Sequence, residues 1–350
     1  MTEKAGMNEQ LAGKRIAYID FLKAFAIATV LLGHSVEQLS GDAFWDHPIW
    51  TFLYSFHMPL FMFVSGLFFK SSLRKGFGEV LRVKLVQLGV PSVTAFLLGL
   101  MIMKVAGVTA IADLCEASFA GFMNSVWFLK CLLFCIVIMW PAVRLLRHDV
   151  LAAVVASTVV LLVPGGETVN LNFMLPCFCL GFLCGNRKEF LERHRRALGI
   201  LAVVVFLALL PFWSGRLTVY MVPTHVLSLS PFSFDLSNLG LSVYRLAIGF
   251  AGTLVFYLAA PAVHRLIAGG RFDAFCEMVG GATLGIYVVQ TFLLEILVHS
   301  LSICLPVWRS CLVAPVLATA ELFICLGVVR LFRRFKLTRI LFLGERPQAR

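Results

Sequence analysis

The sequence predicts an all-α, polytopic integral membrane protein with about ten transmembrane helices. Of its 350 residues, 60% are hydrophobic and only 14% are charged, which is too little polar surface for a water-soluble domain. The apolar residues also form continuous runs of about twenty, the length that a helix needs to cross roughly 30 Å of hydrocarbon. Strands of a membrane barrel would instead alternate polar and apolar residues, so the runs predict helices.

Ten apolar runs, separated by polar or turn-forming segments, define the candidate spans. They are residues 16–36, 51–69, 85–103, 122–140, 150–164, 171–185, 198–213, 239–260, 281–299 and 311–330. The first fifteen residues are too polar for the start of a signal peptide and no cleavage site follows span one, so we expect this span in the mature chain. We expect a cytoplasmic segment 1–15, a membrane domain 16–332 and a basic tail 333–350.

The distribution of basic residues orients these spans. With a cytoplasmic N-terminus, the inner segments carry 24 of the 30 Lys and Arg residues, and the outer loops carry only Lys104, Arg216 and Arg309. The positive-inside rule then places both termini in the cytoplasm. Topology thus explains the net charge of +11, and we expect no nucleic-acid partner.

Span one reads RIAYIDFLKAFAIATVLLGHS and combines an apolar run with ionisable groups. At 100° per residue, four of them fall within about a third of a turn and form one polar stripe: Asp20, Lys23, His34 and Glu37. Asp20 and Lys23 lie near the cytoplasmic end, three residues apart. They either form an ion pair that only anchors the helix or have a functional role, and the sequence favours neither. His34 lies roughly 21 Å farther along, where an ionisable group inside a bundle is functional by default.

Spans two to four add outer polar residues and an inner basic loop. Span two contains YSFHMPLFMFVSG, with His57 about two turns below the outer surface. The inner loop 70–84 carries Arg82 and Lys84, which suit the phosphates of CoA, although topology alone explains the loop equally well. Span four opens NSVWFLKCLL, with Trp127 and Lys130 at a depth similar to that of His57.

Spans five to seven are almost wholly apolar. The ten cysteines of the chain fall largely in apolar runs and lack metal-ligand spacing, so we interpret them as buried hydrophobic residues and expect neither a disulfide nor a metal site. The long outer segment 214–238 is rich in Pro, Ser and Phe. It either covers a site from the outside or is an ordinary connector.

Spans eight to ten supply the remaining intramembrane polar groups. Span eight carries Arg245, span ten carries Glu321, and span nine contains Tyr287 and Gln290, with Glu295 near its outer end. Polar groups at overlapping depth predict a buried polar cavity, because each desolvated charge needs a partner. The cations near outer helix ends could equally reach lipid headgroups.

Several of these segments together resemble the membrane-bound acyltransferase 3 family. The Arg, Ile-Asp, Leu-Lys and closing His of span one match its opening, and four other segments match its later spans: FHMPLFMFVSGLFF, LRVKLVQLGVPSV, SVWFLKCLLFC and GGATLGIYVVQTFLLE. FHMPLF is similar to the branch of fucose 4-O-acetylase-like and nodulation-type sugar acetyltransferases. The resemblance implies transfer of an acetyl or other acyl group from a cytoplasmic thioester, usually acetyl-CoA, to a hydroxyl of a sugar or lipid-linked glycan.

The resemblance also implies roles for individual residues. His34 matches the family's catalytic histidine, and Arg15 and Asp20 match its Arg and Asp at the start of span one. Arg82 and Lys84 match the basic loop that meets the donor. By this likeness, catalysis would rest on His34 with Asp20, and donor binding on the three basic residues.

Acyl transfer to a hydroxyl needs a base for its proton and a donor or cation for the oxyanion. Imidazole titrates near neutrality, so His34 can be the base, while the oxyanion partner stays open between His57, Lys130 and Arg245. The family often has a histidine where this chain has Gln290. The role of that family histidine is therefore in doubt here or has passed to His57. For acceptor binding we predict the outer polar residues Lys130, Trp127, Arg245, Tyr287, Gln290 and Glu295.

The chain contains no GxSxG motif, so we expect direct transfer or an acyl-histidine rather than an acyl-serine. Because the donor end and His34 lie on opposite sides, a hydrophilic path along span one would carry an acyl-pantetheine arm outward. A glycan or lipid transporter is the main competing interpretation, but the internal repeat typical of transporters is not evident. A membrane sensor or scaffold without chemistry is the second. We expect no tightly bound cofactor. The expected partners are the lipid bilayer, an acyl-CoA and a carbohydrate acceptor, at the plasma membrane of a bacterium (its inner membrane).

Overall fold

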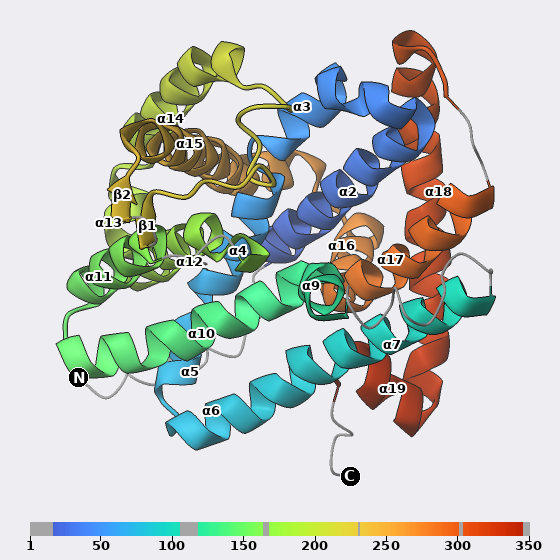
Figure 1. Cartoon of the computed structure of the whole chain (residues 1–350), viewed down its shortest axis with the longest axis horizontal. Coiled ribbons are helices and arrows are strands. Elements are labelled where there is room, and N and C mark those ends of the chain that lie inside the picture. Colours follow the sequence, from blue (N-terminus) through green and yellow to red (C-terminus); the bar gives the residue numbers. More distant parts are fainter. Residues whose placement is uncertain (1–16, 106–117, 164–167, 230–231, 301–303, 346–350) are drawn as a thin grey trace.

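The computed structural model describes residues 17–105, 118–163, 168–229, 232–300 and 304–345 (Figure 1). Its longer helices are α2 (Ala17–Ser40), α4 (His57–Leu67), α7 (Val90–Val105), α10 (Trp127–Leu146), α11 (Asp149–Leu162), α12 (Leu171–Asn186), α14 (Arg195–Leu209), α15 (Leu236–Ile267), α16 (Gly270–Gly280), α17 (Thr283–Ser300) and α18 (Val307–Arg334). Its shorter helices are α3 (Pro48–Tyr54), α5 (Phe69–Leu73), α6 (Phe77–Lys84), α9 (Ser118–Asn124), α13 (Lys188–Arg193) and α19 (Lys336–Leu343). An antiparallel hairpin of β1 (Leu227–Leu229) and β2 (Phe232–Phe234) pairs Ser228 with Ser233.

Within the described ranges, seven helical segments are long and apolar enough to cross a membrane, and the bent pair α16 and α17 makes an eighth if it is one span. α11 and α12 occupy two further predicted spans but are only 14 and 16 residues long. The predicted all-α, multi-pass architecture is confirmed, whereas the count of ten spans stays a prediction. Span three differs at its start: the helical segment begins at Phe77, not at residue 85, and includes a π-helical turn, η2 (Leu85–Gly89).

α2 packs against α4, α15, α16, α17 and α18. Its apolar residues face these neighbours on most sides, so Leu22, Ile27 and Leu31 are almost fully buried. A helix that is apolar nearly all round belongs inside a bundle. The stripe that carries His34 is therefore surrounded by other helices.

α4 and α12 approach more closely than side chains normally allow. A Cβ atom on Gly66 would lie 2.1 Å from the carbonyl oxygen of Phe178, and one on Gly181 would lie 2.0 Å from that of Phe63. Small residues permit such backbone contact between helices in a membrane. The contact fixes the position of α4, whose first residue is His57.

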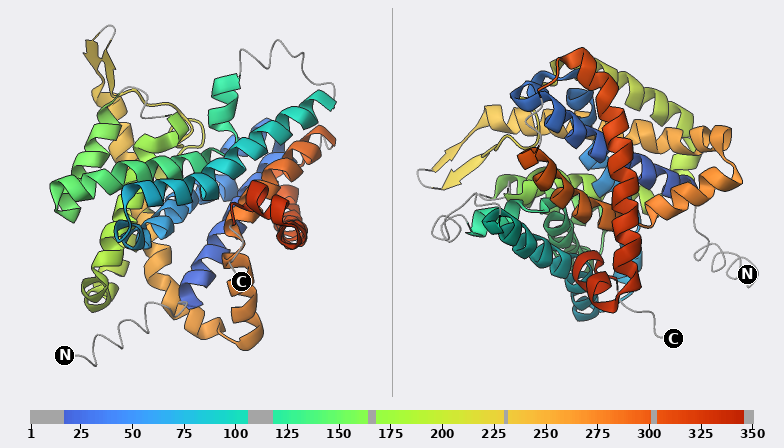
Figure 2. Two further views of the ribbon diagram at one scale, coloured as in Figure 1. Left: turned by 90° about the horizontal axis from the view of Figure 1, so that it is seen from below. Right: turned by 90° about the vertical axis from the view of Figure 1, so that its right-hand side faces the viewer.

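α18 runs in the direction opposed to that of α2 and crosses it obliquely at one face of the molecule (Figure 2). Where α2 ends and α18 begins, the Leu305 N–H donates to the carbonyl of Leu39 at 2.7 Å. At the other end of α2, a Cβ on Gly280 would touch the backbone of Asp20 at 2.9 Å, and Arg333 of α18 reaches the neighbouring Gly281. The two ends of the described chain therefore lie on one side, and that this side is cytoplasmic stays a prediction.

Candidate functional site

The outer pair of the predicted stripe forms the centre of the candidate site. Nδ1 of His34 donates a hydrogen bond to Oε2 of Glu37 at 2.7 Å. The two residues are three apart, so one helical turn brings them together. Because the Nδ1 hydrogen is engaged by the carboxylate, the lone pair of Nε2 is available as a base. The His34 side chain keeps 29% of its surface exposed, so a substrate hydroxyl can reach it.

Two further donors from α3 hold the Glu37 carboxylate. Nε1 of Trp50 and the hydroxyl of Tyr54 donate to its Oε1 at 2.7 and 2.5 Å. Pro48 begins α3, a position where its missing N–H costs nothing, and the i,i+4 spacing puts Trp50 and Tyr54 on one face of this helix. A carboxylate held by three donors fixes the orientation of the imidazole, as a base requires.

His57 lies beside this pair. Its Nδ1 donates to the carbonyl of Leu53 at 2.7 Å, and its ring meets that of Tyr54 edge-on, with 4.5 Å between centroids. It also interacts electrostatically with His34 and Glu37. Nε2 is the ring atom left for a substrate, and it can donate to an oxyanion only when the imidazole is protonated.

We call the hydrogen-bonded pair of His34 and Glu37 the dyad. Two adjoining cavities run along α2 toward it. The basic cavity, about 210 Å³, is lined by Lys23, Ala26, Phe61, Val64, Ser65, Phe68, Lys84, Gln87, Leu132, Ile136 and Thr283. The apolar cavity, about 80 Å³, is lined by Val30, Met58, Phe61, Ser65, Phe128, Leu132, Thr283, Leu284 and Tyr287. Four residues line both. On α2, Lys23, Ala26, Val30 and His34 follow at spacings of three or four, so one helix face leads from the lysines to the dyad.

Lys130 and Arg245 use their donors on the backbone. Lys130 is buried and donates to the carbonyl of Ser125. Arg245 is also buried, and its guanidinium donates to the carbonyls of Thr218 and Val222 at 2.6 and 3.0 Å. Arg245 lies on α15, and its hydrogen bonds thus hold the segment after α14 against this helix. A role of either cation in acceptor binding stays a prediction.

The segment between α14 and β1 packs against the ring of Tyr54, beside His34 and Glu37. Its Val219 and Tyr220 are buried, and the Tyr220 ring lies nearly parallel to that of Tyr54, with 6.0 Å between centroids. Trp127 approaches the same ring at 5.8 Å. Burial raises the pKa of Tyr220 well above its ordinary value, and the Glu37 carboxylate adds to the shift, so its hydroxyl stays protonated and can donate. That this segment covers a site from the outside stays a prediction.

Tyr287 and Gln290 lie on α17. The Tyr287 hydroxyl accepts a bond from the Phe128 N–H at 3.3 Å, and its ring lines the apolar cavity. Gln290 is buried, and among the described residues its Oε1 has no partner. Because an unpaired buried oxygen costs free energy, this atom favours a ligand or water that donates to it. Gln290 therefore offers an amide at a position where the resemblance implied an imidazole.

The remaining predicted residues are placed unevenly. Asp20 is buried and pairs with Lys23 at 3.5 Å. Arg82 is exposed on α6 and, unlike Lys84, does not line the basic cavity. Arg15 and the side chain of Glu295 lie outside the described part of the chain. Within that part, no cluster of three or more His, Cys, Asp or Glu residues could hold a metal ion.

A model of the acyltransferase 3 family, described as an acyltransferase domain, matches residues 16–330. The chain belongs to the acyltransferase 3 family. Among curated relatives, it is similar to nodulation protein NolL of Sinorhizobium fredii (32% identity, covering 51% of each chain). It is also similar to NolL of Mesorhizobium japonicum (40% identity, covering 21% of this chain and 20% of the relative). The match thus spans about half the length of the first relative, and no solved structure matches the chain.

Four residues around the dyad of this acyltransferase 3 chain were not among the predicted site residues: Glu37, Trp50, Tyr54 and Tyr220. The sequence did carry a signal for Glu37, since it lies three residues after His34 and belongs to the polar stripe. Trp50 and Tyr54 reach it only because the 3-10 turn η1 (Gly41–Asp46) brings α3 back toward α2. No local pattern encodes that path.

Proposed function

We propose that the protein is a membrane-bound acyltransferase that moves an acetyl or other acyl group from a cytoplasmic acyl-CoA to a hydroxyl of a sugar or glycan, at the bacterial inner membrane. The observation that supports this most is the single face of α2 that joins Lys23, the two cavities and the His34–Glu37 dyad. Family membership and the likeness to nodulation proteins agree with it.

The donor would enter at the basic cavity. Lys23 and Lys84 line it and can neutralise the phosphates of CoA. The adjoining apolar cavity is narrow, which suits the slim acyl-pantetheine arm rather than the nucleotide. It ends at Val30, one helical turn before His34, so the thioester would stop close to the dyad.

At the dyad, Nε2 of His34 removes the proton of the acceptor hydroxyl while the oxygen of that hydroxyl attacks the thioester carbonyl carbon. The carbon–oxygen bond forms, the carbon–sulfur bond breaks, and the imidazolium returns its proton to the departing CoA thiolate. Glu37 accepts from Nδ1 throughout and stabilises the imidazolium. Direct transfer of this kind needs no acyl-serine.

The acceptor would bind under the segment between α14 and β1, which would cover the site from the outside. The rings of Tyr54, Trp127 and Tyr220 pack together beside the dyad, and flat aromatic faces with polar edges suit a molecule that is apolar on one face and hydroxylated at its rim, such as a sugar. The hydroxyl of Tyr220 and the free oxygen of Gln290 supply one donor and one acceptor.

The test is thiol release from acyl-CoA by the purified full-length chain in lipid vesicles, with and without sugar acceptors. His34→Gln keeps a hydrogen-bonding side chain but cannot carry a proton, so we expect turnover to fall by about 10²–10⁴-fold while the protein still inserts. Turnover of His34→Gln within a few-fold of the unchanged chain would remove His34 from this role. A wild-type chain that releases no thiol with any acceptor would contradict the proposed function.

A further inference from the structure

The C-terminal segment contacts both walls of the basic cavity. Gly344 ends α19 with a positive φ of 61°, and a Cβ atom there would lie 2.2 Å from the carbonyl oxygen of Gln87, a residue that lines the cavity from η2. Only glycine fits this position, because both the backbone conformation and the space exclude a side chain. One wall of the cavity therefore rests on the end of α19.

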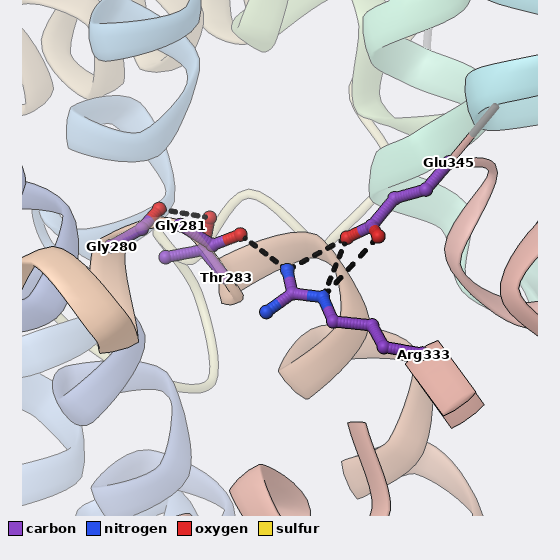
Figure 3. Close-up of polar contacts among 5 residues, drawn as sticks. All are labelled: Gly280, Gly281, Thr283, Arg333 and Glu345. Atoms are coloured by element: carbon purple, nitrogen blue, oxygen red, sulfur yellow. Dashed lines mark hydrogen bonds and ion pairs between the residues drawn. The ribbon is translucent and has the colours of Figure 1, made fainter. Parts of the chain in front are cut away.

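The opposite wall is held through Arg333. This residue, near the end of α18, donates from Nη2 to the carbonyl of Gly281 at 2.9 Å, in the break between α16 and α17 (Figure 3). Two residues later, Thr283 begins α17 and lines both cavities. α16 and α17 are bent by 67° at this break, so the Gly281 carbonyl marks the point at which the wall changes direction.

Glu345 joins the two contacts. Its Oε1 accepts from Nε and Nη2 of Arg333 at 3.0 and 2.7 Å, and its Oε2 accepts from Nε at 3.3 Å, so three charge-assisted contacts hold the guanidinium (Figure 3). Glu345 directly follows Gly344, so the residue that touches Gln87 and the residue that orients Arg333 are neighbours in the chain. The Leu343 side chain, packed against Gly285 of α17, adds an apolar contact to the same bridge.

We propose that Arg333 and Glu345 are positioning residues for the donor, and that the segment 336–345 sets the width of the basic cavity by bridging Gln87 and Thr283. This inference rests on the proposed function. Neither side chain lines either cavity, so both act through the walls and not by touching the acyl-CoA.

Charge and geometry predict opposite outcomes for Glu345→Gln. Removing a carboxylate near the cavity would by charge alone favour an anionic donor and lower its KM. Loss of the bridge loosens the cavity walls instead, so we expect the KM for acyl-CoA to rise about threefold to tenfold, with kcat and the acceptor KM nearly unchanged. The matched control is Glu192→Gln, an equal change of charge that breaks the Arg195–Glu192 pair (4.0 Å) away from both cavities; it should leave the donor KM unchanged.

Gly344→Ala tests the bridge from its other end, without altering charge. It should raise the donor KM in the same direction, and this variant decides the matter if Glu345→Gln fails to accumulate. The pair is partly exposed, at 36% and 37% for the two side chains, so thermal stability should hardly change in Glu345→Gln. If the wild type transfers acyl groups but the donor KM of the variants falls or stays constant, the proposed bridge is wrong and the proposed function still stands. Absence of transfer by the wild type contradicts the proposed function itself.

Discussion

Glu37 determines which nitrogen of His34 is free. Its carboxylate has two oxygens, and Oε2 takes the His34 hydrogen while Oε1 takes those of Trp50 and Tyr54. All three partners donate, so a group that only accepts is required at this position. An amide cannot satisfy all of them at once.

We therefore expect Glu37→Gln to lower kcat by about 10²-fold or more, since an amide N–H facing Nδ1 would favour the tautomer that has its proton on Nε2. Steady-state acyl transfer measures the effect. Glu192→Gln, an equal change of charge at an exposed position of α13, serves as control and should transfer at the wild-type rate. A Glu37→Gln chain with more than a third of wild-type kcat would show that the carboxylate does not orient the base.

The His34–Glu37 pair could be predicted from the sequence because both residues lie on one helix, where spacing alone fixes proximity. The donors from α3 and the packing of Tyr220 against Tyr54 could not, since they depend on how the chain turns between helices. Lys130 and Arg245 illustrate the same limit: the sequence places both in apolar runs, but the loop carbonyls that take their hydrogens are set by tertiary structure.

At the scale of elements, the segment from α6 through η2 to α7 supplies the basic wall of the donor cavity. The sequence pointed to Arg82 and Lys84 together, as one basic loop. In the folded chain, α6 turns Lys84 toward the cavity, where it bonds Oε1 of Gln87 at 2.8 Å, while Arg82 is exposed. The two residues are separated by about 200° of rotation around the helix axis, so their side chains point to nearly opposite sides.

Replacement of these two residues by neutral ones should weaken donor binding unequally. We expect Lys84→Met to raise the dissociation constant for acyl-CoA about tenfold, the effect of losing one charge-assisted contact. Arg82→Ala should also weaken the donor more than the acceptor, but by less than Lys84→Met. Titration of a CoA thioester against each variant measures both. Equal and unchanged affinities would leave the basic loop as a determinant of topology alone.

For the whole molecule, the contact between α2 and α18, which run in opposed directions, places both ends of the described chain on one side. The excess of Lys and Arg in the inner segments predicts that this side is the cytoplasm. Reporter fusions after residue 350 and in the loop near residue 220 should accordingly report opposite compartments. If both report the same compartment, the order of spans and the depth of His34 need revision.

α11 is a single helix of 14 residues, and its Val154, Val155 and Val159 side chains are exposed. At 1.5 Å per residue it covers about 21 Å, against roughly 30 Å of hydrocarbon. Lipids beside a spanning helix this short would have to compress or tilt, and the resulting mismatch costs fractions of a kcal/mol per ångström. If α11 crosses the membrane as the sequence predicts, the bilayer would be thinner at this edge of the protein, and turnover should depend on the chain length of the surrounding lipids.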